Sequence, residues 1–122
     1  MKEKLKQLLL EHYAYHHALG VLSLDSETAA PRASSEGRGY AMALLSEKRY
    51  ELLTSEATRE LLANLTAAQE QLDEAQRREA ELLQEEVEQL TRIPKEEYSA
   101  YARLVNDASA AWLTAKENND YA

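Results

Sequence analysis

Residues 98–115 of the chain read YSAYARLVNDASAAWLTA. Apolar side chains recur there at steps of three and four residues, at Tyr98, Tyr101, Val105, Ala108, Trp112 and Ala115. This spacing is typical of an amphipathic α-helix with one buried face. Pro94 suits the first position of that helix, because its missing N–H is not needed there, and Asn118 and Asn119 are typical stop signals. The stretch therefore predicts a long helix, with Trp112 in the core rather than in a ligand platform.

The same spacing predicts further helices over about residues 2–24 and 35–53, a short one beginning near 55, and a long charged one over about 67–92. Pro31 marks the clearest break between them. The residues predicted to face inward are Leu5, Leu8, Leu9, His12, His16, Leu19, Ser23, Ala41, Leu44, Leu45, Leu52, Leu61, Leu62, Leu65, Leu72, Ala75, Leu82, Leu83, Val87 and Leu90. Glu79 and Glu86 fall close to the last stripe, where each carboxylate must be paired or must reach water.

Composition agrees with helices throughout. The 122 residues include only three Gly and two Pro, and helix formers such as Leu, Ala and Glu dominate. We expect an all-α fold in which four to five helices form an antiparallel bundle or paired helical hairpins. The length fits a single helical domain over residues 1–122.

Charge and cysteine content narrow the classes of function. The formal net charge is −8, which disfavours binding to nucleic acid or to an anionic membrane. The chain has no cysteine, so disulfides and thiolate metal sites are excluded. The Leu8–Leu10 run is interrupted by Glu11 and His12, and no run approaches the ~20 apolar residues of a membrane span. We expect a cytoplasmic protein with neither membrane nor nucleic-acid partners.

His12 and His16 form the most obvious candidate metal site. They lie four residues apart on one helical face, a spacing that can bind zinc. Tyr13, however, stands where a helical zinc protease carries its general-base Glu, and hydrolysis also needs a third ligand. We therefore favour packing of these imidazoles among leucines and keep metal binding as the weaker alternative.

Asp25 and Glu27 are two residues apart near the end of the first predicted helix. Paired carboxylates can perform acid–base chemistry, but near a helix end they more often accept backbone hydrogen bonds. Arg38 begins the second predicted helix and is expected to pair with Asp25 or Glu27 across the Pro31 turn. Each of these interpretations is structural.

The order of several landmarks resembles the N-terminal helical region of the carboxypeptidase Taq family of metallocarboxypeptidases. The landmarks are Leu24-Asp25-Ser26-Glu27-Thr28, Ala30-Pro31, Arg38, Leu45-Ser46, Leu53-Thr54-Ser55, Ile93-Pro94, Trp112, Ala115-Lys116 and Asn119-Asp120. Leu24, Ser26 and Ala30 depart from the family's usual Trp, Gln and Met. The resemblance covers roughly residues 5–121.

The resemblance implies helices that cover a substrate groove in enzymes that release C-terminal residues from peptides with a divalent, zinc-type metal. The family's His-Glu-x-x-His helix and its further metal ligand lie downstream of the matching region. No catalytic or metal residue is therefore assigned, and this chain is expected to hold no cofactor of its own. The matching positions, expected to be structural or to line a groove, are Asp25, Glu27, Thr28, Pro31, Arg38 and Trp112.

Three hypotheses about function follow. The first is a non-catalytic N-terminal region of such an enzyme, inactive alone, whose partner is the missing catalytic portion or a second copy of the chain. The second is an autonomous acidic helical module for protein interaction or self-association. The third is a metal-binding bundle that uses His12 and His16.

Overall fold

The computed structural model describes residues 1–28 and 31–120, and within these residues the chain is helical with no strand. The helices are α1 (Lys2–Thr28), α2 (Ser35–Thr54), α3 (Glu56–Ala67), α4 (Glu74–Thr91) and α5 (Lys95–Glu117). Two 3₁₀ turns, η1 (Arg32–Ser34) and η2 (Gln69–Gln71), join them. The predicted all-α fold is confirmed. No helix of the described residues is both long and apolar enough to cross a membrane.

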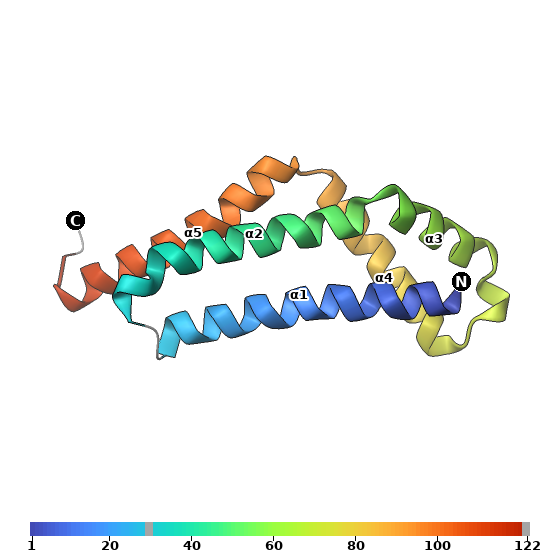
Figure 1. Cartoon of the computed structure of the whole chain (residues 1–122), viewed down its shortest axis with the longest axis horizontal. Coiled ribbons are helices and arrows are strands. Elements are labelled where there is room, and N and C mark those ends of the chain that lie inside the picture. The colour runs from blue at the N-terminus through green and yellow to red at the C-terminus, as the bar shows by residue number, and fades with distance from the viewer. Residues whose placement is uncertain (29–30, 121–122) are drawn as a thin grey trace.

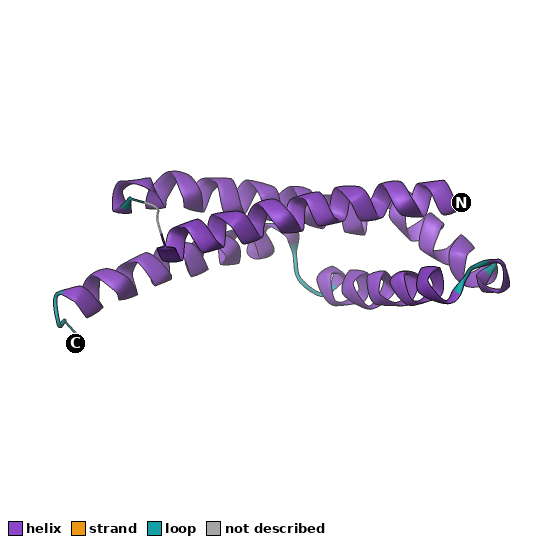
Figure 2. Cartoon of the chain, turned by 90° about the horizontal axis from the view of Figure 1, so that it is seen from below, coloured by secondary structure: helices purple, strands orange, loops and turns teal. Residues whose placement is uncertain are grey.

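The helices are arranged as paired hairpins (Figure 1). Helices α1 and α2 run antiparallel, and α5 returns antiparallel along α2, which it contacts more extensively than any other helix does. Helices α3 and α4 lie at the end of the molecule that holds the N-terminus, whereas the carboxyl end of α5 lies at the opposite end (Figure 2). The molecule is therefore elongated, and its two ends are built from different helices.

A leucine core holds the end formed by α3, α4 and the beginning of α1. Its buried members are Leu5, Leu8, Leu53, Leu61, Leu62, Leu65, Leu72, Leu83, Val87 and Leu90. Leu53 and Leu65 are completely shielded from solvent. Burial was predicted for every one of these positions except Leu53, which sequence reasoning missed. The predicted inward positions His16, Leu44, Ala75 and Leu82 are wrong, because all four side chains are exposed. Leu82 is exposed because Leu83, one residue on, takes the core-facing position of α4.

Helix α4 begins later than the spacing predicted. Helix α3 ends at Ala67, the chain turns through η2, and Leu72 then packs into the core in an extended conformation. Asp73 begins the new helix as its N-cap in a capping box. Its side chain accepts from the Gln76 N–H, while the Gln76 side chain accepts from the Asp73 N–H. This signal stops one long helix from forming over 67–92.

A charged cluster lies between α1, α2, α4 and α5. The buried Arg49 forms an ion pair with Glu86, and its Nη1 donates to the Tyr98 hydroxyl at 2.8 Å. The buried His12 places Nε2 3.3 Å from Glu86 Oε2. Glu86 is therefore paired, as the sequence required of a carboxylate on this stripe. Beside it, the Tyr13 hydroxyl donates to Glu79 at 2.9 Å.

Beyond Tyr98, which contacts Arg49 and Tyr50 of α2, helix α5 packs on α2 through small and polar side chains rather than through the predicted apolar stripe. Asn106 is its only fully buried residue, and its neighbours on that face, Ala102 and Ala110, are half-buried. Gly39 of α2 permits this approach, because a Cβ there would meet Asn106 Nδ2 at 2.9 Å. The predicted core position of Trp112 is therefore wrong, because its side chain is 62% exposed.

Candidate functional site

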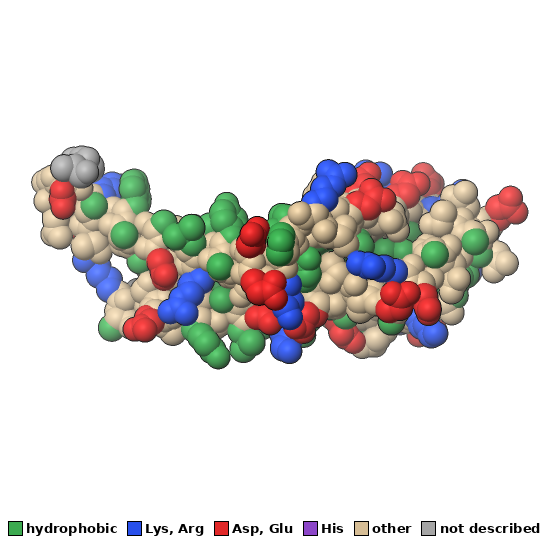
Figure 3. Space-filling view, turned by 90° about the horizontal axis from the view of Figure 1, so that it is seen from above, with side chains coloured by type: hydrophobic (Ala, Val, Ile, Leu, Met, Phe, Trp, Pro, Cys, Tyr) green, Lys and Arg blue, Asp and Glu red, His purple; other side chains and the backbone are tan. Residues whose placement is uncertain are grey.

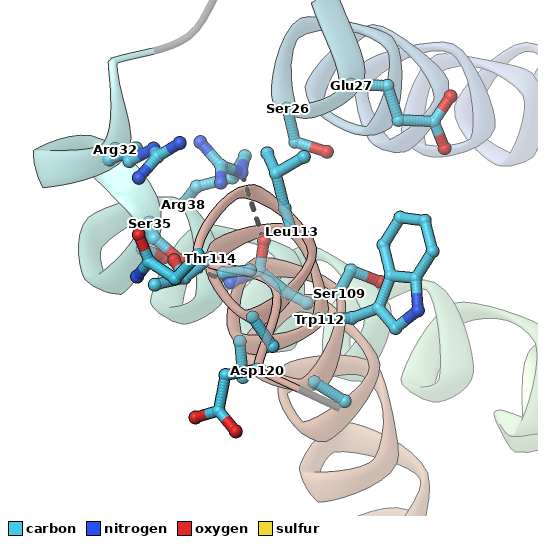
Figure 4. A pocket seen from close by; sticks show the side chains of 16 residues that line it. Ser26, Glu27, Arg32, Ser35, Arg38, Ser109, Trp112, Leu113, Thr114 and Asp120 are labelled. Carbon is cyan, nitrogen blue, oxygen red and sulfur yellow. Dashed lines mark hydrogen bonds between the residues drawn. The ribbon is translucent and has the colours of Figure 1, made fainter. Parts of the chain in front are cut away.

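A groove of about 920 Å³ lies between the carboxyl end of α1, the beginning of α2 and the second half of α5. Ser26 and Glu27 come from α1, Arg38 comes from α2, and Trp112 and Leu113 come from α5 (Figure 4). We call this cavity the α1–α5 groove. It collects three positions predicted to be structural or groove-lining, Glu27, Arg38 and Trp112, which are far apart in the sequence.

One polar network fixes the floor of the α1–α5 groove. Arg38 Nε donates to Asn106 Oδ1 at 3.0 Å, and its Nη1 donates to Ser34 Oγ at 2.9 Å. Asn106 Nδ2 in turn donates to the Ser35 carbonyl at 3.0 Å. These bonds join the start of α2 to the middle of α5, so Arg38 holds the two helices in register. The Ser34 hydroxyl is used in this network and in a bond to the Pro31 carbonyl, and it does not cap α2.

The predicted ion pair between Arg38 and Asp25 or Glu27 is wrong. Arg38 turns toward α5 because Asn106 offers it a buried amide oxygen, whereas Asp25 and Glu27 are exposed at the end of α1. Arg32, in η1, forms the ion pair of this region with Glu117 of α5. The turn between α1 and α2 is thus tied to α5 rather than back to α1.

Trp112 forms part of the apolar wall of the groove. The described contact of its ring is with Lys116, whose Nζ lies 5.1 Å from the ring centre on the next turn of the same helix. Leu113 lies beside it on α5, and alanines supply the rest of the apolar lining. The wall therefore offers a flat aromatic surface to whatever enters the groove.

The remaining predicted positions lie at the edge of this site. Asp25 is exposed on α1. Thr28 ends α1 and donates its hydroxyl to the Leu24 carbonyl at 2.7 Å. The Pro31 carbonyl accepts from the Ser34 N–H at 3.0 Å. Ala30 lies outside the described residues. Thr28 therefore ends α1 and Pro31 directly precedes η1, next in sequence to the lining residues Glu27 and Arg32.

The structure places no third metal ligand with His12 and His16 within the described residues. Among these residues, no three His, Cys, Asp or Glu side chains are placed to hold one ion. His12 faces Glu86 in the charged cluster, and His16 is exposed. Burial and the neighbouring Arg49 lower the pKa of His12, although Glu79 acts in the opposite direction. The described residues therefore do not provide the three-ligand set that a catalytic zinc needs.

A family model described as the carboxypeptidase Taq (M32) metallopeptidase family matches residues 4–122. The chain belongs to this family. It is 33% identical over 107 residues to Carboxypeptidase 1 of Bacillus subtilis (strain 168), a match that covers 88% of this chain and 21% of the relative. A crystal structure of BsuCP superposes with a TM-score of 0.89 at 32% identity, covering 98% of this chain and 24% of that one. Both matches lie in the relative's N-terminal region. The chain thus spans only about a quarter or less of the length of these metallopeptidases.

Sequence reasoning missed Asn106, which lines the groove, and Gly39, which lets α5 approach α2 closely. Asn106 lies inside the apolar spacing of residues 98–115, where a polar side chain is normally assigned to the solvent face. Gly39 follows Gly37 closely, and only the close approach of α5 distinguishes the two. A glycine near the start of one predicted helix and an amide in the middle of another were the available signals.

Proposed function

We propose that this chain is the non-catalytic N-terminal helical part of a metal-dependent carboxypeptidase that releases C-terminal residues from peptides. The observation that carries this proposal is the α1–α5 groove, in which the family-matched positions Glu27, Arg38 and Trp112 come together. Its apolar wall and hydrogen-bonded floor suit the binding of a protein surface or an extended chain. The three positions therefore provide a shaped wall of helices, and other residues perform the chemistry.

In this proposal the catalytic portion lies in residues outside this chain and holds a divalent metal of the zinc type. The metallopeptidase description of the family supports the metal. Residues 1–122 act as one helical unit, and the working partner is that catalytic portion. The proposed location is the cytoplasm. The support is that the apolar run Leu8–Leu10 is short and ends at the charged Glu11.

The isolated 122-residue chain should not hydrolyse peptides. We would incubate it with peptides of varied C-terminal residue, with and without added zinc, and follow release of free amino acids. No release above a heat-denatured control is expected. Release that rises with zinc and disappears with a chelator would contradict the proposal.

A second candidate function is an autonomous acidic interaction module. The exposed Glu81, Glu85 and Glu88 on α4, together with the net charge of −8, favour it. Such a module should bind a basic partner through α4, whereas the proposed function uses the opposite end of the molecule. Replacing these three glutamates by Gln distinguishes the two functions. Binding to a basic partner should be lost if the chain is an interaction module and unchanged if it is part of a carboxypeptidase.

A further inference from the structure

Helix α5 carries an apolar stripe with the spacing of a core face. Tyr98, at its start, contacts Arg49 and Tyr50 of α2, but from Tyr101 to Trp112 the stripe is exposed in the described residues. Tyr101, Val105 and Trp112 share the stripe, and each is exposed, Tyr101 by 65%. Leu113 lies seven residues after Asn106, close to that residue's side of the helix, and is 37% exposed where it lines the α1–α5 groove. Apolar side chains reach the surface along much of one face of the molecule, with charged side chains among them (Figure 3).

This pattern is unlike scattered surface leucines. Single exposed apolar residues are common, but an aromatic stripe at three- and four-residue steps, continuous with a groove, indicates a surface that is covered by protein. The opposite face of α5 already packs on α2 through Asn106. The stripe is thus available to a second body without any rearrangement of the helices.

The charge of the chain argues against a second copy as that body. Two molecules of net charge −8 repel one another, and no described feature places a positive patch of one copy opposite the stripe of another. The relatives indicate a different candidate for the body that covers the stripe, namely the rest of such an enzyme. About four fifths of the Bacillus subtilis relative lies outside the region that this chain matches.

We infer that the stripe Tyr101–Val105–Trp112 and the adjoining α1–α5 groove form the docking surface for the remaining body of a carboxypeptidase Taq-type chain. This inference rests on the proposed function and adds to it the face that is used. Trp112 and Leu113 become buried at that contact, where large apolar side chains at the centre of an interface contribute most of the binding energy. The outer face of α4 stays in solvent.

The test puts residues 4–122 of this chain in place of the matching region of the Bacillus subtilis relative. The result is an intact full-length protein, which we call the exchange protein. Trp112→Ser and Leu113→Ser are compared with Leu82→Ser, a leucine on α4 with a similar exposed fraction of 43%. In the exchange protein, the first two substitutions should shorten the half-life of peptidase activity at elevated temperature by at least about tenfold, and Leu82→Ser by less than about twofold.

The same substitutions in the isolated chain provide the control. There all three side chains are exposed, so the melting temperatures of the Leu113→Ser and Leu82→Ser proteins should agree within about 3 °C. If Leu113→Ser destabilised the isolated chain as strongly as it destabilises the exchange protein, Leu113 would have a role inside the helical fold. That result would overturn the inference. Equal half-lives for Leu113→Ser and Leu82→Ser in the exchange protein would also overturn it.

Two further outcomes separate this inference from the proposal beneath it. A folded, metal-loaded exchange protein that carries no substitution and lacks peptidase activity contradicts the proposed function itself. Acrylamide quenching of the single tryptophan, Trp112, tests the second copy. A dimer of the isolated chain that protects Trp112 from acrylamide assigns the stripe to self-association and overturns the inference, whereas free quenching at every chain concentration supports it.

Discussion

The two ends of the molecule are held together by different kinds of contact. Around α3 and α4, leucines fill the interior, and Leu53 and Leu65 are completely shielded. Along α2 and α5, the contact is made by a glycine, an amide and a guanidinium, through Gly39, Asn106 and Arg38. The first end buries most of its apolar side chains, whereas the second leaves its largest ones, including Trp112, in solvent.

The two ends therefore have different roles: one stabilises the fold, and the other sets the position of α5. Burial of apolar area supplies most of the free energy of folding, so the leucine end stabilises the chain. Hydrogen bonds contribute less net energy but demand defined directions, so the Arg38–Asn106 contact sets where α5 lies. An end fixed by geometry, with exposed apolar side chains, is suited to meeting another protein.

The largest expected effect comes from removing a side chain at the leucine end. Leu65→Ala should lower the free energy of unfolding by about 3 kcal/mol, through lost burial and the cavity left behind. Urea denaturation followed by circular dichroism measures it. Leu82→Ala, on the exposed face of α4, should cost less than about 1 kcal/mol. Equal losses at the two leucines would remove the distinction between core and surface on which the comparison depends.

A smaller loss is expected in the charged cluster between the two ends. Glu86→Gln removes the charge that faces the buried Arg49 and His12, and should lower the free energy of unfolding by about 2 kcal/mol. Glu86 is partly exposed, which keeps the value below that of a fully buried pair. Glu81→Gln, whose pair with Arg78 is exposed, should change it by less than about 0.5 kcal/mol. If the two substitutions had the same effect, the cluster would contribute no more than a surface pair.

Two glycines on one helix test the close approach of α5. Gly39→Ala places a methyl group 2.9 Å from Asn106 Nδ2 and should destabilise the chain by about 1–2 kcal/mol. Gly37→Ala meets nothing within 4 Å and should stabilise it by about 0.5–1 kcal/mol through helix propensity. Thermal unfolding of the two proteins should therefore shift in opposite directions. A stabilising Gly39→Ala would show that α5 does not need this contact.

The leucine end could be predicted from sequence, and the groove end could not. Leucine spacing in Leu61, Leu62 and Leu65 leaves one face to bury, and the structure buries it. In α5, two faces satisfy helical spacing: the aromatic one and the small one that includes Asn106. Hydrophobicity favours burial of the aromatic face, but the structure buries the small face, because Gly39 lets α2 approach closely there and Arg38 pairs with Asn106.

The groove residues were found by a different kind of signal. Glu27, Arg38 and Trp112 were selected as groove positions by resemblance to a family. Periodicity marks only Trp112 among them, and it predicted a core position instead. Their convergence depends on how α1, α2 and α5 cross, which is a tertiary property. Arg38 was also assigned the wrong partner, since proximity in sequence favoured Asp25 and Glu27 over an amide 68 residues away.

The smallest expected effect is a dependence of stability on pH through His12. Burial and Arg49 hold the pKa of His12 below its ordinary value of 6.5, while Glu79 opposes them and Glu86 lies at 3.3 Å. Between the ordinary and the lowered pKa, the unfolded chain binds a proton that the folded chain does not. The free energy of unfolding should therefore decrease as the pH falls through about 6.5.

Urea denaturation at several pH values from 7.5 downward measures this dependence. His12→Gln should make the free energy of unfolding change less over the range just below pH 6.5, because the buried titrating ring is gone. His16→Gln, which alters an exposed imidazole one turn away, should leave the pH dependence of the unsubstituted chain in place. If His16→Gln reduced the pH dependence and His12→Gln did not, proton binding would be linked to the exposed face of α1 instead of to the cluster that joins the two ends.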